Sequence, residues 1–241
     1  MDALKKFKEI VLSSNNIVFF GGAGVSTESK IPDFRSETGL YSTKFGKFPA
    51  ETMLSRTFFD EHPHEFYQFY REKMIYPDAK PNPAHIALAK LEQQGRLKAV
   101  ITQNIDGLHQ KAGSKKVLEL HGSVLRNHCM KCGKFYDLSI ITESKDIPTC
   151  LSCGGKIKPD VTLYEEPLND EVFIEAMDYI RNADVFIIGG TSLVVYPAAS
   201  LIQYYYGDEL ILINKAATAF DSRADLVLRE NIGEVFSSLL E

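Results

Sequence analysis

The sequence lacks any apolar run of the roughly 18 to 20 residues that a membrane-spanning helix requires. It also lacks a surplus of basic charge, because 32 aspartates and glutamates outnumber its 27 lysines and arginines. A net charge of −5 argues against nucleic acid or an anionic membrane as the main partner. No small-residue cleavage site follows the first apolar stretch, which Ser13–Asn16 interrupts. We therefore expect a cytoplasmic protein that binds neither nucleic acid nor membrane directly.

Cysteine is scarce, and all four cysteines fall into two CxxC pairs separated by residues 133–149. A spacer of roughly 15 to 20 residues between such pairs is typical of tetrahedral zinc sites. Four thiolates close the coordination sphere and leave no position for water, so the pattern predicts a structural zinc. A redox dithiol and an iron–sulfur site are the alternatives, and we interpret His128 as a loop histidine rather than a ligand. The expected ligands are Cys129, Cys132, Cys150 and Cys153.

The rest of the chain alternates between strand and helix patterns. Short apolar runs such as NIVFFGG, KAVITQNID, DVFIIGGTS and ELILIN read as buried strands. Between them lie helical patterns such as NPAHIALAKLEQQGRL, NDEVFIEAMDYIRNA and YPAASLIQYYY. Strands separated by helices of this length predict right-handed crossovers and a parallel sheet. Between about residues 122 and 158 cysteines, glycines and lysines replace this periodicity, which indicates a small separate module.

Several of the predicted strands end in polar or glycine-rich turns. The run GGAGVS follows the first strand, as in phosphate-binding loops, although a plain strand-to-helix turn is an alternative and no third glycine completes the dinucleotide fingerprint. The turns QNIDGLH, GGTSL and LIN end later strands. Because ligands of open parallel sheets bind at the carboxyl ends of strands, these turns predict one nucleotide crevice. Thr191 and Ser192 could donate to phosphate there, and Asn214 could reach a ribose or phosphate.

The order of these motifs carries a family resemblance. GAGVS followed by IPDFR, then TQNIDGLH, HG at residues 121–122, the paired CxxC, GTSLVVYPA and IN resemble the sirtuins, the NAD-dependent protein-lysine deacylases. The resemblance spans roughly residues 17 to 215 and is closest to the bacterial and archaeal branch. It implies an α/β fold in which a Rossmann-like parallel-sheet domain carries a small zinc-binding module and a helical insert.

The resemblance also implies a division of the chain into two domains. Residues 1–35, 76–121 and 159–241 would form the Rossmann-like NAD-binding domain. The helical insert, residues 36–75, and the zinc-ribbon module, residues 122–158, would form the small domain. An acetyl-lysine protein or peptide would enter the cleft between the two domains, with NAD as co-substrate and one structural zinc.

By the same resemblance, the acyl oxygen attacks the ribose of NAD and nicotinamide leaves. His121 would be the general base on the ribose hydroxyls, a task that suits a group with a pKa near neutrality. Asn104 would contact ribose or water, and Asp106 the nicotinamide amide. Ile105 would lie in the nicotinamide pocket and Gln103 would contact the ribose.

The remaining NAD contacts implied by the resemblance fall into two groups. The first belongs to the flexible loop behind the first strand, where Phe34 would screen the reacting carbon from water; the group comprises Ala23, Thr27, Asp33, Phe34 and Arg35. The second lies at the adenosine end and comprises Thr191, Ser192, Asn214, Lys215 and Ile232.

The chain departs from the family pattern at several positions. Lys30 stands where the family usually has glycine, a change that is tolerable if the backbone angles there are ordinary. We interpret it as a solvated loop lysine, and electrostatic help to a nearby pyrophosphate is the alternative. Tyr164 and Glu165 replace the phenylalanine and glycine of the substrate-facing strand, and the added carboxylate could favour cationic peptides. In the helical insert, the Tyr-x-x-Arg pair of sirtuins that remove acidic acyl groups reads Tyr67-x-x-Tyr70. Arg71 comes one position, or about 100°, later on the helix, so we expect short neutral acyl groups, chiefly acetyl.

Two other functions remain as alternatives. The same site could transfer ADP-ribose to protein or hydrolyse NAD. The chain could also be a non-catalytic module that senses NAD, although the presence of Asn104, Asp106 and His121 together argues against it.

Overall fold

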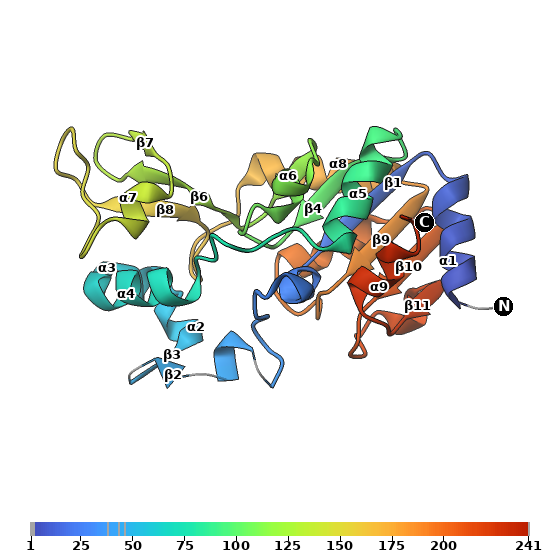
Figure 1. The fold of residues 1–241 in the computed structure, drawn as a ribbon, viewed down its shortest axis with the longest axis horizontal. Helices are drawn as coiled ribbons and strands as arrows, with labels where there is room; N and C mark the ends of the chain where they lie inside the picture. Colours follow the sequence, from blue (N-terminus) through green and yellow to red (C-terminus); the bar gives the residue numbers. More distant parts are fainter. Residues whose placement is uncertain (1–2, 38, 43, 46, 241) are drawn as a thin grey trace.

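The computed structural model describes residues 3–37, 39–42, 44–45 and 47–240. Figure 1 shows an elongated molecule with a large sheet and its helices at one end and a smaller sheet with short helices at the other. Among the described residues, no helix is both long and apolar enough to cross a membrane. The predicted fold class, a parallel-sheet α/β protein with a cysteine module and a helical insert, is confirmed.

The large sheet has six strands, and all of its neighbouring strands pair in parallel. The chain adds strands to one side of the first strand and then returns to add the others on its opposite side. In spatial order the strands are β11 (Leu226–Leu228), β10 (Glu209–Ile213), β9 (Val185–Gly189), β1 (Ile17–Gly21), β4 (Leu97–Thr102) and β5 (Val117–Glu119). The direction of winding therefore reverses between β1 and β9, and this is the point where open sheets bind ligands.

Each face of the sheet has its own apolar core, because successive strand residues point to opposite faces. Phe19 and Ile187 face one core, and Phe20 and Ile188 face the other. The first core is covered by α1 (Ala3–Ser13), α5 (Pro83–Gln93) and α9 (Ile232–Ser237). The second is covered by α8 (Asp170–Asn182) and the 3₁₀ helix η3 (Ala198–Tyr204). Helix α6 (Leu108–Ala112) packs beside α5.

The small end of the molecule has a third core, which two separate chain segments share. The helical segment contains β2 (Lys44–Phe45), β3 (Phe48–Pro49), α2 (Ala50–Met53), α3 (Arg56–Glu61) and α4 (Pro63–Lys73). The cysteine segment contains β6 (Gly122–Cys129), β7 (Phe135–Tyr136), α7 (Ser139–Thr142) and β8 (Ile157–Val161). Phe59 and Tyr67 from the first segment pack with Ile141 and Ile157 from the second. Neither segment is long enough to bury such a core alone, which explains why they lie together.

Two local features refine the expectations from sequence. The segment YPAASLIQYYY is helical as its pattern predicts, but as the 3₁₀ helix η3, which ends at Tyr204. The hydroxyl of the next residue, Tyr205, lies 2.6 and 2.9 Å from the carbonyl oxygens of Asp184 and Glu209. Strand β11 has only three residues, too few for a sequence pattern to indicate a strand.

Lys30 does not have ordinary backbone angles, the condition under which a lysine would readily replace glycine here. It ends the 3₁₀ helix η1 (Ala23–Ser29) with φ 65° and ψ 24°, in the left-handed region. The left-handed conformation costs a residue with a Cβ about 1 to 2 kcal/mol, whereas glycine adopts it without that steric cost. Its side chain is exposed, as the solvated-lysine interpretation requires. Lys30 therefore ends η1 in a conformation that favours glycine.

Candidate active site

The candidate site lies along the carboxyl edge of the large sheet. The turn after β1 contains η1, the turn after β4 contains Gln103–Asp106, and His121 follows β5. On the other side of β1, Thr191 follows β9 and Asn214 follows β10. Since parallel strands end at the same edge, the turns that the sequence singled out converge there, as predicted.

The glycines after β1 allow close backbone packing. A Cβ on Gly24 would lie 2.7 Å from the Cα of Gly190, in the turn after β9. The amides of Gly22 and Gly24 donate to the carbonyl oxygens of Gly189 and Gly190, at 3.2 and 2.8 Å. A phosphate-binding loop offers free N–H groups, and these two amides are instead bonded within the protein. The glycines are needed because two turns meet at the switch point of the sheet.

A serine that the sequence analysis did not single out joins two predicted site residues. The Ser26 hydroxyl donates to Asp106 Oδ2 at 2.6 Å and accepts from Asn104 Nδ2 at 3.1 Å. Asp106 Oδ1 accepts from the amide of Leu108 at 2.9 Å. Burial raises the pKa of Asp106, and these hydrogen bonds oppose that shift. Ser26 is the last residue of the GAGVS motif. Serine is common in turns, so its presence there does not by itself indicate a site residue.

His121 is held in one tautomer by the backbone. Its Nδ1 lies 3.0 Å from the carbonyl oxygen of Gln103. A carbonyl only accepts, so Nδ1 carries the proton and Nε2 keeps its lone pair. Burial lowers the pKa of His121 from its ordinary value of 6.5, and the bond to Gln103 opposes this only in part. The imidazole is therefore a neutral proton acceptor at pH 7.

Steric constraints explain why the residue after His121 is glycine. Gly122 has φ 75°, and a Cβ there would lie 1.9 Å from the carbonyl oxygen of Asp160 on β8. The carbonyl oxygen of His121 accepts from the amide of Thr162 at 3.0 Å. The backbone beside His121 is thus packed against the strand that leaves the cysteine module, which fixes the imidazole between the two ends of the molecule.

The residues predicted for the adenosine end spread over three turns. Thr191 is tied to the other half of the site, because its Oγ1 accepts from Gln103 Nε2 at 3.0 Å. Ser192 and Lys215 are exposed, and Asn214 bonds to the carbonyl oxygen of Ala216. Ile232 is buried at the start of α9.

Glu28 links this end to the loop after β1. Its carboxylate accepts from the amide of Gly233 at 2.7 Å, which joins η1 to the start of α9. The sequence analysis missed this contact, because it spans two segments that are distant in the chain.

The loop residues Asp33–Arg35 fold back on a following turn. The carbonyl oxygens of Asp33 and Phe34 accept from the amides of Leu40 and Tyr41 at 2.8 and 2.9 Å. Asp33 Oδ1 also accepts from the amide of Ser36 at 2.9 Å, so this acid helps to order the loop. The Phe34 ring lies 5.4 Å from that of Tyr41, and the Arg35 guanidinium lies 5.4 Å from the same ring. We call residues 33–37 and 39–42 the lid segment.

The other predicted loop residues belong to η1. Ala23 is its first residue, and the Thr27 hydroxyl donates back to the carbonyl oxygen of Gly24 at 3.0 Å. Ile105 is half-buried and packs against the small-end core, and its carbonyl oxygen accepts from the amide of Val124 at 3.0 Å. Ile105 thus touches the small end while its neighbours Asn104 and Asp106 are bonded to Ser26.

The four cysteines form one cluster, as predicted. Their sulfur atoms all lie within 4.8 Å of one another, with Cys129 and Cys153 at 3.4 Å and Cys132 and Cys150 at 3.7 Å. Tetrahedral zinc with bonds of about 2.3 Å needs sulfur separations of about 3.8 Å. The amides of Cys132 and Ser152 point at Cys129 Sγ and Cys150 Sγ, at 3.5 and 3.4 Å, which favours thiolates. The cluster therefore fits one zinc, and His128 is not part of it.

Arg71 points away from the helix face that carries the two tyrosines. Its guanidinium donates to the carbonyl oxygen of Asp146 in the cysteine segment at 3.0 Å. Tyr67 and Tyr70 are both fully buried in the small-end core. The orientation predicted for Arg71 from the helical repeat is thus confirmed, while its consequence for acyl choice stays a prediction.

Together, the fold and the site define a class: a Rossmann-like α/β protein whose carboxyl edge meets a four-cysteine zinc module beside a partly buried histidine. The model of the Sir2 family matches residues 22–197. The chain therefore belongs to the Sir2 family, as the motif order suggested.

Individual relatives and solved structures agree with this assignment over nearly the whole chain. The chain is 61% identical to an NAD-dependent protein deacetylase of Clostridium perfringens, covering 100% of this chain and 99% of the relative. It is 60% identical to an NAD-dependent protein deacetylase of Clostridium tetani, with 100% and 98% covered. A structure of a Sir2 protein with a p53 peptide and NAD+ is 41% identical, with a TM-score of 0.86 and coverage of 98% and 97%. A Sir2 variant with deacetylated p53 peptide and 3'-O-acetyl ADP ribose has a TM-score of 0.89 at 41% identity, with 98% and 97% covered.

Removal of zinc should unfold the small end of the molecule. Cys129 and Cys150 lie in the same core as α4 and β8, with Cys153 packed against it. Structural zinc contributes on the order of 10 kcal/mol to the folding of small modules. A chelator should therefore lower the melting temperature and abolish activity, and elemental analysis should find about one zinc per chain beforehand. Cys132→Ser should do the same without a chelator. Protein that stays folded and fully active when metal-free would refute the structural role.

The pKa of His121 can be measured directly. We expect its imidazole to titrate below 6.5, because burial disfavours the charged form. The base is then competent at neutral pH and is lost as the pH falls through the lowered pKa. An NMR titration of the histidine ring signals checks this, with the His121 signal assigned by its absence in His121→Gln. A midpoint above 6.5 would show that the bond to Gln103, and not burial, dominates.

Proposed function

We propose that the protein is an NAD-dependent protein-lysine deacetylase, which transfers the acyl group of an acetyl-lysine protein or peptide to ADP-ribose and releases nicotinamide. The observation that carries this proposal is the fixed tautomer of His121, with Nε2 free to accept a proton at the edge where the strands end. The relatives over the full chain length are named for the same activity. No described helix spans a membrane, and we propose the cytoplasm as the place of action.

The proposed roles of the residues follow from their environment. NAD, when bound, supplies the ribose carbon that exchanges nicotinamide for the acyl oxygen. His121 would accept a proton from a ribose hydroxyl at Nε2, since Nδ1 is engaged. Asn104 and Asp106 would orient the nicotinamide end, because Ser26 holds both side chains in place. Phe34 would exclude water from the reacting carbon.

The rest of the NAD site and the domain division are proposed on the same basis. Gln103 and Ile105 would line the ribose and nicotinamide side, and Ala23, Thr27, Asp33 and Arg35 the loop side. Thr191, Ser192, Asn214, Lys215 and Ile232 would hold the adenosine end. We propose the division at residues 35/36, 75/76, 121/122 and 158/159, which places His121 at the last residue before the cysteine module.

A product assay separates this function from its alternatives. Purified protein, NAD and an acetyl-lysine peptide should give nicotinamide, free lysine peptide and acetyl-ADP-ribose in equal amounts by mass spectrometry. His121→Ala should give none of the three. A succinyl-lysine peptide of the same sequence should react more slowly, because Tyr70 and not arginine faces the core beside Tyr67.

Each alternative has its own result in that assay. ADP-ribose attached to protein would indicate ADP-ribosyl transfer, and nicotinamide without peptide deacetylation would indicate NAD hydrolysis. Faster removal of succinyl than of acetyl would contradict the proposed acyl preference. A biological activity that His121→Ala leaves intact would support the non-catalytic sensing module.

A further inference from the structure

The turn after β1 is held by a buried amide side chain that lies outside every motif of the site. Asn82, the residue before α5, is 6% exposed. Its Nδ2 donates to the carbonyl oxygen of Val25 at 2.7 Å and to the hydroxyl of Ser29 at 3.1 Å. Val25 and Ser29 lie on either side of Ser26 in η1. Asn82 therefore fixes the short segment that carries the Ser26 hydroxyl.

The amide group of Asn82 can take only one orientation. Its Oδ1 accepts from the amide of Ala84 at 3.0 Å and so caps the first turn of α5. Since a backbone amide only donates and a carbonyl oxygen only accepts, the oxygen must face Ala84 and the nitrogen must face Val25. One side chain thus has two separable tasks: its oxygen caps a helix, and its nitrogen holds η1.

The start of α5 is itself fixed relative to the turn after β4. The amide of Asn82 donates to His85 Nδ1 at 3.3 Å, which completes a capping box. Burial lowers the pKa of His85 to about 4, so its ring is neutral at pH 7 and can accept this bond. The ring lies 4.7 Å from that of His109 in α6, and both rings are buried. Helix α6 begins at Leu108, whose amide donates to Asp106.

These contacts form a closed ring behind the proposed NAD site. Ser26 bonds to Asp106, Asp106 bonds to the start of α6, and α6 packs on α5. Asn82, at the start of α5, then returns to η1. Apolar packing is not directional, whereas hydrogen bonds are, so the two bonds from Asn82 set the position of η1 more closely than packing alone.

We infer that Asn82 is a positioning residue for NAD, which holds η1 so that Ser26 can orient Asn104 and Asp106. This inference rests on the proposed function. Asn82 acts through the backbone of η1 and needs no contact with NAD itself. Because η1 leads within a few residues into the lid segment, Asn82 also fixes the point from which that segment starts.

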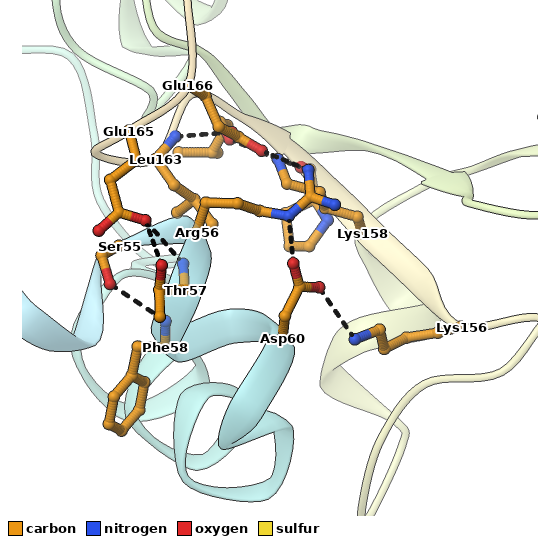
Figure 2. Close-up of polar contacts among 12 residues, drawn as sticks. Ser55, Arg56, Thr57, Phe58, Asp60, Lys156, Lys158, Leu163, Glu165 and Glu166 are labelled. Atoms are coloured by element: carbon orange, nitrogen blue, oxygen red, sulfur yellow. Dashed lines mark hydrogen bonds and ion pairs between the residues drawn. The ribbon is translucent and has the colours of Figure 1, made fainter.

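The turn after β8, on the strand that we expect to face the peptide, has anchors of its own. Figure 2 shows this turn against the start of α3. One carboxylate oxygen of Glu165 accepts from the amide and the hydroxyl of Thr57 at 2.9 and 2.7 Å. Glu166 accepts from Arg56 at 3.1 Å and from Lys158 at 3.0 Å. None of these contacts includes α5 or η1, so a change at the start of α5 should leave the peptide side in place.

Glu165 replaces a glycine of the family pattern, and its backbone has φ 76°, where glycine is favoured. The bonds to Thr57 lower the pKa of Glu165, so it is charged at neutral pH. Its effect on the choice between cationic and other peptides stays a prediction.

Two substitutions separate the tasks of the Asn82 side chain. Asn82→Asp keeps the oxygen that caps α5 and places an acceptor, in place of the donor, against Val25. Asn82→Ser keeps a preferred N-cap residue but lacks the Nδ2 group. The affinity of carba-NAD, an analogue that does not lose nicotinamide, is measured by calorimetry, and kcat/KM for NAD by the product assay. Both quantities should fall about tenfold in both variants, as expected for two lost hydrogen bonds, while KM for the peptide stays within about twofold.

A matched control comes from another helix cap. Asn169 caps α8 through the same kind of bond, in which Oδ1 accepts from the amide of Val172 at 3.1 Å, and it is exposed. Asn169→Asp should therefore keep the wild-type affinity for carba-NAD and the wild-type rates. The melting temperatures of all three variants should stay within a few degrees of the wild type.

The outcomes separate the role of Asn82 from a general structural effect and from the proposed function. Wild-type carba-NAD affinity in both Asn82 variants overturns the inference, and so does an equal loss of peptide and carba-NAD binding. If Asn82→Asp does not fold, Asn82→Ser decides alone. A wild-type protein that binds carba-NAD but deacetylates no peptide overturns the proposed function, while the carba-NAD affinities of the variants still decide the role of Asn82.

Discussion

The arrangement of the site depends on one buried hydroxyl. Ser26, in the turn after β1, donates to Asp106 and accepts from Asn104 in the turn after β4. Burial disfavours the charged form of Asp106, and the hydrogen bond from the Ser26 hydroxyl at 2.6 Å stabilises the buried carboxylate. Without this hydroxyl the Asn104 side chain would lose its hydrogen bond to the turn after β1, and Asp106 would keep only the bond from the amide of Leu108. The same η1 segment also reaches α9 through Glu28, so one short turn orders both ends of the proposed NAD site.

Backbone packing at the switch point supplies the second constraint. Gly24 and Gly190 approach closely enough to exclude a Cβ, and Gly122 meets the carbonyl oxygen of Asp160 in the same way. The first contact brings the turns after β1 and β9 together. The second packs the backbone next to His121 against β8 of the cysteine segment. The imidazole then needs only the carbonyl oxygen of Gln103 to select its tautomer. Steric demands of the backbone, and not special side chains, thus place the proposed base.

The sequence predicted those features that are local. Alternating strands and helices, the spacing of the CxxC pairs and the polar ends of strands each depend on short stretches, and the structure confirms the sheet and the cysteine cluster. It could not predict backbone angles at single positions, such as the left-handed conformation of Lys30. Nor could it predict side-chain contacts between distant segments, such as Glu165 with Thr57 or Tyr164 with Tyr41. Those contacts depend on how the helical segment and the cysteine segment share a core.

The most direct test of this account is the catalytic rate of Ser26→Ala with a saturating acetyl-lysine peptide and NAD. The substitution removes both bonds of the hydroxyl, one of them to a carboxylate, while it leaves the backbone and His121 in place. We predict that kcat falls about tenfold to a hundredfold, as expected for a lost hydrogen bond to a charged group. The melting temperature and zinc content should stay close to those of the wild type, and Ser144→Ala, in the cysteine segment, should behave as wild type. A kcat within about twofold of the wild type would contradict the claim that Ser26 holds the site together.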